Sequence, residues 1–193
     1  MSNNLYVYTY QHTCNKGHQA YILKNAPFKA PVRIVKGKKK IPFLGEGYYL
    51  WEENMAAAHR WGQKHYNNIY SIVEYKDLEI NDGEFLDLTD RRQLEYFKNL
   101  QDTFTSKRPE SASWKLGQWI EFFKFNRQRD HALFPFNYIK ADEHLPDIEE
   151  NQLVRQKVFF SEGMPYFTYF SPLYMLCVID KKQMKFDSET FVT

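Results

Sequence analysis

The sequence predicts an α+β fold, in which strands and helices occupy separate parts of the chain. Segments with strand and helix patterns follow one another without a regular βα repeat, which argues against a doubly wound parallel sheet. Aromatic residues make up 18% of the chain, and its 193 residues are enough to bury a sizeable core. We therefore expect one domain spanning residues 1–193, with a helical insertion at about 89–130.

The chain begins with a predicted strand and a short helix. Residues 5–10 are dense in tyrosine and β-branched side chains, which favours a strand. Residues 15–24 have an apolar helical face, and Asn15 is placed to cap that helix. A loop or twisted hairpin over 29–40 follows, and its tip carries four ammonium groups. These belong to Lys36, Lys38, Lys39 and Lys40.

A glycine turn, a strand and a helix come next. Gly45 and Gly47 flank a single charge, residues 48–51 are bulky enough for a short buried strand, and 52–66 form an alanine-rich helical pattern. Glycine permits a close backbone approach, so this unit could press a flat ligand against tyrosine rings. A plain turn before a core strand is the alternative.

Two further strands are predicted before the insertion. Residues 69–75 alternate between apolar and polar side chains, and 84–88 form a second short apolar run after the turn signal at 81–83. Together these segments indicate a sheet edge or a hairpin.

The insertion is predicted to hold two amphipathic helices. Thr89 can cap a helix over 90–103, and a second helix over 113–127 places Leu116, Trp119, Ile120 and Phe123 on one stripe. Such an aromatic stripe is typical of a core rather than of a ligand site.

The end of the chain returns to strands. We expect strands over 134–139, 153–160 and 173–179, separated by an acidic loop at 142–151 and a connection marked by glycine and proline at 163–172.

Composition narrows the classes of function. A formal net charge of +2 does not by itself indicate nucleic-acid binding. The two cysteines, Cys14 and Cys177, are far apart, and the six histidines lack ligand spacing, so neither a disulfide framework nor a metal site is predicted. The sequence has no phosphate-loop, dinucleotide, zinc-protease or serine-hydrolase motif, no apparent signal segment and no membrane helix. A reducing cytoplasm is the simplest expectation.

Several spaced segments together carry a resemblance to a known family. They are Gln11-His12-Thr13 after the first strand, Ala20-Tyr21-Ile22-Leu23 in the first helix, Leu44-Gly45-Glu46-Gly47-Tyr48-Tyr49-Leu50, and the alanine-rich helix that contains Trp61. The chain resembles the ADP-ribosyltransferase superfamily, in particular its diphtheria-toxin and poly-ADP-ribose-polymerase branch with small bacterial members. The resemblance covers about the first 65 residues and the last strands. It implies a split β-sandwich that holds NAD in an open cleft.

The resemblance assigns the NAD-binding residues one by one. His12 matches the first-strand histidine, which bonds the adenosine-side ribose and the nicotinamide amide, with Gln11 and Thr13 beside it. Thr13 stands where the family usually has glycine. Tyr49 matches the tyrosine that stacks on nicotinamide, and Gly47 and Tyr48 precede it in the same motif.

The third motif departs from the family at its catalytic position. The family has a glutamate there, and this chain has Gln156. A glutamine can bond a ribose hydroxyl but supplies no negative charge for the cation that forms as nicotinamide leaves. Glu162, Glu149 and Glu150 are nearby carboxylates that could substitute, and Glu162 ranks first by its position near the end of the same predicted strand.

Three functions stay open on the sequence. The first is a mono-ADP-ribosyltransferase, resembling a toxin or effector, that uses NAD without a metal and modifies a protein or nucleic acid. The second is an inactive module of the same fold that binds nucleotides or nucleic acid, with phosphate contacts at the lysines of 36–40. The third is an interaction domain in which Tyr48, Tyr49 and Trp51 are only core residues.

Overall fold

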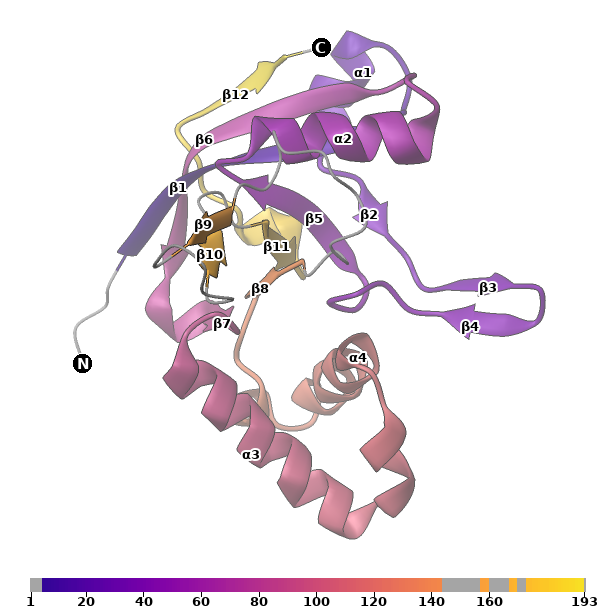
Figure 1. Ribbon diagram of the computed structural model, residues 1–193, viewed down its shortest axis with the longest axis vertical. Coiled ribbons are helices and arrows are strands. Elements are labelled where there is room, and N and C mark those ends of the chain that lie inside the picture. Colours follow the sequence, from indigo (N-terminus) through magenta and orange to yellow (C-terminus); the bar gives the residue numbers. More distant parts are fainter. Residues whose placement is uncertain (1–4, 144–156, 160–166, 170–172, 193) are drawn as a thin grey trace.

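The centre of the molecule is an eight-stranded sheet with strand order β12-β6-β1-β5-β11-β8-β7, and β2 pairs with β5 beside this path (Figure 1). The computed structural model describes residues 5–143, 157–159, 167–169 and 173–192. Within these residues every pairing in the sheet is antiparallel except β7 with β8. The strands are β1 (Leu5–Cys14), β2 (Lys29–Ala30), β5 (Gly47–Glu52), β6 (Ser71–Asn81), β7 (Phe85–Asp87), β8 (Tyr138–Asp142), β11 (Tyr174–Val178) and β12 (Ser188–Phe191).

Two small hairpins and four helices complete the described elements. The hairpins pair β3 (Arg33–Val35) with β4 (Lys38–Lys40), and β9 (Lys157–Phe159) with β10 (Phe167–Tyr169). The helices are α1 (Gln19–Asn25), α2 (Met55–Tyr66), α3 (Arg91–Lys107) and α4 (Leu116–Arg127). Figure 1 places α1 and α2 at one end of the sheet and α3 and α4 at the other. The predicted α+β class is therefore confirmed.

Side-chain caps define where the helices begin, and two of them differ from the sequence prediction. The Asp90 carboxylate, not Thr89, accepts hydrogen bonds from the first backbone N–H groups of α3. His18, not Asn15, caps α1, so that helix begins later than predicted. Asn54 caps α2 by accepting from the Ala57 N–H at 2.9 Å.

Strand pairing decides between two alternatives and corrects one further prediction. β7 lies at the sheet edge, as one alternative predicted, and runs parallel to β8 instead of forming a hairpin with β6. The predicted strand at 134–139 begins only at Tyr138, because a 3-10 turn over His131–Leu133 precedes it. Phe134 fills the core between this turn and the strand.

The helices of the predicted insertion pack against the sheet. Phe97 on α3 and Trp119, Ile120 and Phe123 on α4 are buried against Ile139, Ala141 and Cys177 of the sheet. The aromatic stripe of the second helix is thus core, as its pattern predicted. The helical layer and one face of the sheet share a single hydrophobic cluster.

A buried ion pair ties β5 to β8 on the other face of the sheet. Lys140 Nζ donates to Glu52 Oε1 at 2.7 Å, and both side chains are only 8% exposed. Tyr10 donates to the second Glu52 oxygen at 2.9 Å, and Asp87 lies 3.8 Å from Lys140 Nζ. Burial alone would lower the pKa of Lys140, but the two carboxylates outweigh it and raise that pKa above its ordinary value.

Removing one partner of this pair leaves the other charge buried and unpaired in the core. We expect Lys140→Met to lower the free energy of unfolding by about 3 to 5 kcal/mol, because Glu52 stays buried without its cation. The double variant Lys140→Met/Glu52→Leu should regain most of that loss. Urea unfolding of the two variants measures both values, and a double variant less stable than Lys140→Met would contradict the account.

Candidate functional site

A cleft opens where β1 and β5 part. The two strands pair only at Tyr10 with Glu52 and at Gln11 with Trp51, and further along β5 pairs with β2 instead. The cavity at this split has a volume of about 640 Å³. Its lining includes His12 and Thr13 of β1, Tyr49 and Trp51 of β5, and Trp61 of α2. The sheet therefore brings first-motif and second-motif residues to one cavity.

The imidazole of His12 bridges the split. Its Nε2 accepts the Phe28 N–H at 2.9 Å, and its Nδ1 lies 2.9 Å from the Tyr49 carbonyl oxygen. Since Nε2 accepts, we assign the ring proton to Nδ1, which donates to Tyr49. Burial lowers the pKa of His12 to about 4, so the ring is neutral at pH 7. Both ring nitrogens are already bonded to backbone groups, so a ribose hydroxyl would have to displace one of these bonds.

The Tyr49 hydroxyl is bonded into the glycine turn. It donates to the Gly45 carbonyl oxygen at 2.6 Å and accepts from the Leu44 N–H at 2.8 Å. Burial raises the pKa of this phenol above its ordinary value. The hydroxyl thus closes the turn, and what Tyr49 contributes to the cleft is its ring.

The turn itself is held by α4. Gly45 has φ +78°, a left-handed conformation that favours glycine, and an added Cβ would lie 2.6 Å from Glu121 Oε1. The same carboxylate oxygen accepts the Glu46 N–H at 2.6 Å, and Lys124 Nζ donates to the Glu46 carbonyl oxygen at 2.5 Å. The predicted insertion therefore fixes the turn that leads into β5.

Gly47 and Tyr48 serve the sheet rather than the cavity. A Cβ on Gly47 would lie 2.8 Å from the Val178 carbonyl oxygen and closer still to Cys177 Sγ, so glycine is needed for β11 to approach. Tyr48 packs with the opposite core, and Lys181 Nζ lies 5.5 Å from its ring centroid. Neither residue is in the cavity lining that the described residues form.

Gln11 and Thr13 tie β1 to α2. The Gln11 side chain accepts from the Asn54 N–H at 3.1 Å, and the Thr13 hydroxyl donates to the Ala58 carbonyl oxygen at 2.8 Å. Thr13 still lines the cavity, while Gln11 is not in its described lining. The remaining predicted carboxylate and amide positions lie outside the described residues. They are Gln156, Glu162, Glu149 and Glu150.

Glu143 is a carboxylate in the cavity wall that the sequence analysis did not single out. It follows β8 directly, and its N–H donates to the Leu173 carbonyl oxygen at 2.9 Å. Burial raises the pKa of Glu143, although Arg60 and Lys64 act in the opposite direction. Among the described residues its Oε2 is buried without a hydrogen-bond partner. The only feature of the sequence that could have indicated Glu143 is its position at the end of a strand.

Rings and cations form the other walls. The Trp61 ring centroid lies 4.0 Å from that of His65 and 6.0 Å from that of Trp51, both at tilted angles, so α2 presents an aromatic surface to the cavity. Lys16 and Arg33 also line it. The i, i+4 spacing of Trp61 and His65 on a helix was the available signal for this wall.

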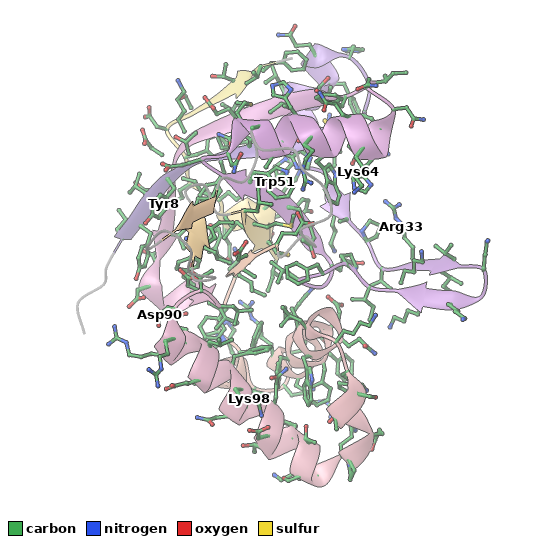
Figure 2. The ribbon with its side chains drawn as sticks, in the orientation of Figure 1. Tyr8, Arg33, Trp51, Lys64, Asp90 and Lys98 are labelled. Atoms are coloured by element: carbon green, nitrogen blue, oxygen red, sulfur yellow. The ribbon has the colours of Figure 1, made fainter. Side chains whose placement is uncertain are left out.

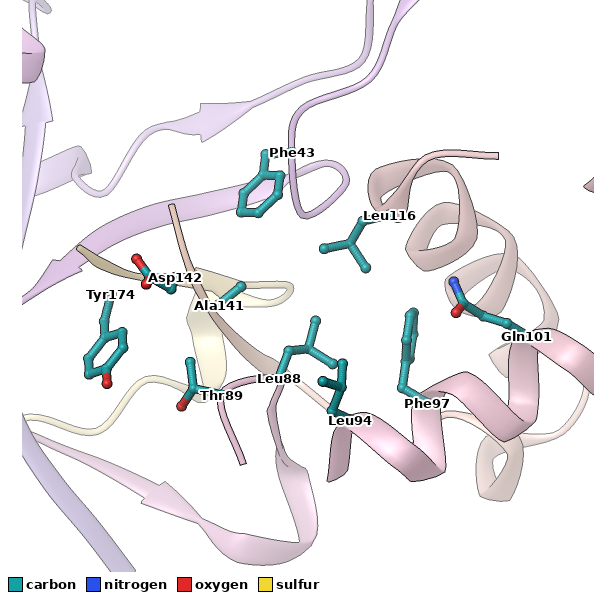
Figure 3. A pocket seen from close by; sticks show the side chains of 10 residues that line it. All are labelled: Phe43, Leu88, Thr89, Leu94, Phe97, Gln101, Leu116, Ala141, Asp142 and Tyr174. Carbon is teal, nitrogen blue, oxygen red and sulfur yellow. The ribbon is translucent and has the colours of Figure 1, made fainter. Parts of the chain in front are cut away.

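A second cavity of about 430 Å³ lies between the sheet edge and α3 (Figure 3). Its lining is mainly apolar, with Leu88, Leu94, Phe97 and Leu116 around it, and Phe43 lines both cavities. None of the predicted site residues within the described part of the chain lines this second cavity.

The described residues contain neither a candidate metal site nor a candidate membrane span. No group of three or more His, Cys, Asp or Glu side chains there could hold a metal ion. Within those residues, no helix has the length and apolar character needed to cross a membrane. Comparison of the chain with protein-family models, curated proteins and solved structures finds no match.

The neutral His12 bridge predicts a pH dependence of stability. Its pKa is lowered from 6.5 to about 4 in the folded state, so the unfolded chain takes up a proton first as the pH falls. The stabilisation is complete above pH 6.5 and is lost between about 6.5 and 4, which amounts to about 3 kcal/mol.

Urea unfolding at a series of pH values measures this loss. A His12→Gln variant should lack this share of the pH dependence, whereas the control His131→Gln, at an exposed position, should keep it. Identical pH profiles for the His12 variant and the native protein would contradict the bridge.

The role assigned to Gly47 can be tested separately. Gly47→Ala should lower the free energy of unfolding by about 1 to 3 kcal/mol, because β11 must move away from the new methyl group. Gly83→Ala is the control, since a Cβ there meets nothing within 4 Å. Equal stability of the two variants would contradict this packing role. Gly47 would then stay a predicted position at which a ligand approaches the backbone.

Proposed function

We propose that the chain is an NAD-dependent mono-ADP-ribosyltransferase, resembling a toxin or effector, that releases nicotinamide and transfers ADP-ribose to a macromolecule. One observation carries the proposal. His12 and Tyr49, which stand 37 residues apart in the sequence, meet across a split in the sheet and line one cavity. The family resemblance assigns both of these positions to the NAD site.

The size and lining of the cavity support a dinucleotide as the ligand. A volume of about 640 Å³ falls within the range of small-molecule sites, which are lined mostly by apolar and aromatic groups. Trp61 and Tyr49 offer ring faces to the planar ends of NAD, while Lys16 and Arg33 offer charge to its pyrophosphate. NAD enters this proposal as a substrate, and the proposal requires no metal.

Glu143 is the described carboxylate best placed to assist the reaction. As nicotinamide leaves, positive charge develops on the ribose ring. A carboxylate at ~4 Å from that charge is worth up to about 4 kcal/mol at an effective dielectric of 20, or roughly three orders of magnitude in rate. The raised pKa of Glu143 reflects a buried charge that lacks full compensation, and the developing cation would supply it. Gln156 and Glu162 stay predictions for the same role.

The second candidate is an inactive module that binds a nucleotide in the same cavity. The bonding of His12 and Tyr49 favours it, because the ring nitrogens of one and the hydroxyl of the other are already used within the protein. Gln156, which stands at the family's glutamate position, favours it as well. A reducing cytoplasm suits both candidates, since Cys14 and Cys177 are free thiols.

Nicotinamide release from NAD by the purified protein tests the proposal. Glu143→Gln should lower kcat at least about 100-fold with little change in NAD affinity, because it removes only the charge that faces the transition state. Glu95→Gln, an exposed neutralisation on α3, is the matched control and should keep the native rate. Gln156→Ala tests the third motif in the same assay.

The Trp61→Ala variant tests the binding wall. It should weaken NAD binding, measured by calorimetry, about tenfold or more, in line with the loss of one stacking surface. Native protein that binds NAD but releases no nicotinamide would establish the inactive module. Native protein that is folded and binds no NAD at millimolar concentration would overturn the transferase, and failure to bind any other nucleotide as well would overturn the inactive module.

A further inference from the structure

The hairpin of β3 and β4 projects from the body of the molecule as an arm (Figure 1). Its two strands pair Arg33 with Lys40, Ile34 with Lys39 and Val35 with Lys38, and every residue from 33 to 40 is exposed. We call residues 33–40 the basic arm. Within the described residues neither of its strands pairs with another sheet, and the side chains of both faces are exposed.

The basic arm carries five cations and no acidic side chain. They are Arg33, Lys36, Lys38, Lys39 and Lys40. Successive residues of a strand point to opposite faces, so Lys38 and Lys40 lie on one face and Lys39 on the other. None of the five forms an ion pair with a described residue. A protein of net charge +2 thus concentrates uncompensated positive charge in one projection.

The root of the basic arm is fixed next to the cleft. Glu46 accepts from the Val32 N–H at 3.1 Å and pairs with Lys29 at 2.5 Å, so the chain entering the arm is bonded to the glycine turn. Arg33 belongs both to the arm and to the cavity lining. Figure 2 shows Arg33 at the root of the arm, on the same side as the Lys64 end of α2. Positive charge therefore runs from the tip of the arm to the cavity mouth.

We propose that the basic arm docks single-stranded nucleic acid by its phosphate backbone and brings one nucleotide to the mouth of the cleft. The acceptor of ADP-ribose is then a nucleic acid, and this second statement rests on the transferase activity proposed above. Docking itself does not depend on that activity.

The arrangement of the charges favours a nucleic acid over other polyanions. Cations on both faces and at the tip suit a flexible phosphate chain that follows the arm, whereas a flat anionic membrane meets one face only. A line of cations that leads into an aromatic pocket is the combination that single-stranded nucleic acids require, since their bases stack on exposed rings. An acidic protein segment would use the cations but not the aromatic wall of Trp61 and His65.

Fluorescence anisotropy with a labelled single-stranded oligonucleotide of mixed sequence tests the docking. The arm variant changes Lys36, Lys38, Lys39 and Lys40 to Gln. The matched control changes the exposed Lys76, Lys107, Lys182 and Lys185 to Gln, so both proteins lose the same charge. We expect the arm variant to bind at least about tenfold more weakly at low salt, and the slope of log K against log salt to fall by about 3. The control should keep the native affinity and slope.

Three outcomes would overturn the docking proposal. One is equal loss of affinity in the arm variant and the control, which would mean attraction to net charge alone. Another is binding of vesicles rich in anionic lipid, lost in the arm variant, without binding of the oligonucleotide. Nicotinamide release by the arm variant separates the two proposals, because it should equal the native rate. Native release with no oligonucleotide binding would refute docking while leaving the transferase intact.

The acceptor role has its own readout. Native protein given NAD labelled in its adenylate part should transfer label to the oligonucleotide, and the arm variant should transfer at least about tenfold less. Label that appears on added protein but never on the oligonucleotide would overturn this part of the proposal.

Discussion

The structure depends on how the chain closes the gap between β1 and β5. Backbone pairing between these strands ends after two residue pairs, and the neutral His12 ring replaces the missing ladder by joining the Phe28 N–H to the Tyr49 carbonyl oxygen. An unpaired backbone group buried at this point would cost about 1 to 3 kcal/mol, so the ring holds the sheet together where it opens. The cleft exists because a side chain, and not a strand, spans this part of the sheet.

The helical layer acts on the same cleft from the other end. Glu121 and Lys124 of α4 bind the backbone of Glu46, and the Tyr49 hydroxyl binds the backbone on either side of Gly45. The turn's donors and acceptors are thus used within the protein, which leaves ring faces, cations and Glu143 as the groups that meet a ligand. This explains why the glycine turn before β5, whose sequence resembles a ligand-binding loop, mainly holds the start of β5 in a fixed position. It also gives α4 a role in shaping the cleft, although neither Glu121 nor Lys124 belongs to the described cavity lining.

Local patterns in the sequence predicted the elements better than their partners. Propensity and periodicity over a few residues were enough to predict four of them: the first strand, the turn before β5, the alanine-rich α2 and the basic hairpin. The placement of β7 beside β8 and the split beyond Gln11 arise from long-range pairing, which no local pattern encodes. His12 and Tyr49 were found by resemblance, but their bonding partners are backbone groups that carry no sequence signal. Beyond its position at the end of a strand, Glu143 carries no local signal, because the cations that act on its pKa, Arg60 and Lys64 of α2, stand more than 70 residues earlier.

The proposal for this protein places NAD in the cleft at the split between β1 and β5. Photolabelling with an azidoadenine analogue of NAD, followed by peptide mapping, tests this placement. We expect saturable labelling of peptides from α2 and from the segment around Phe28 to Arg33, suppressed by unmodified NAD and reduced in Trp61→Ala. Labelling confined to α3 and the second cavity, or labelling that NAD fails to suppress in folded protein, would contradict it.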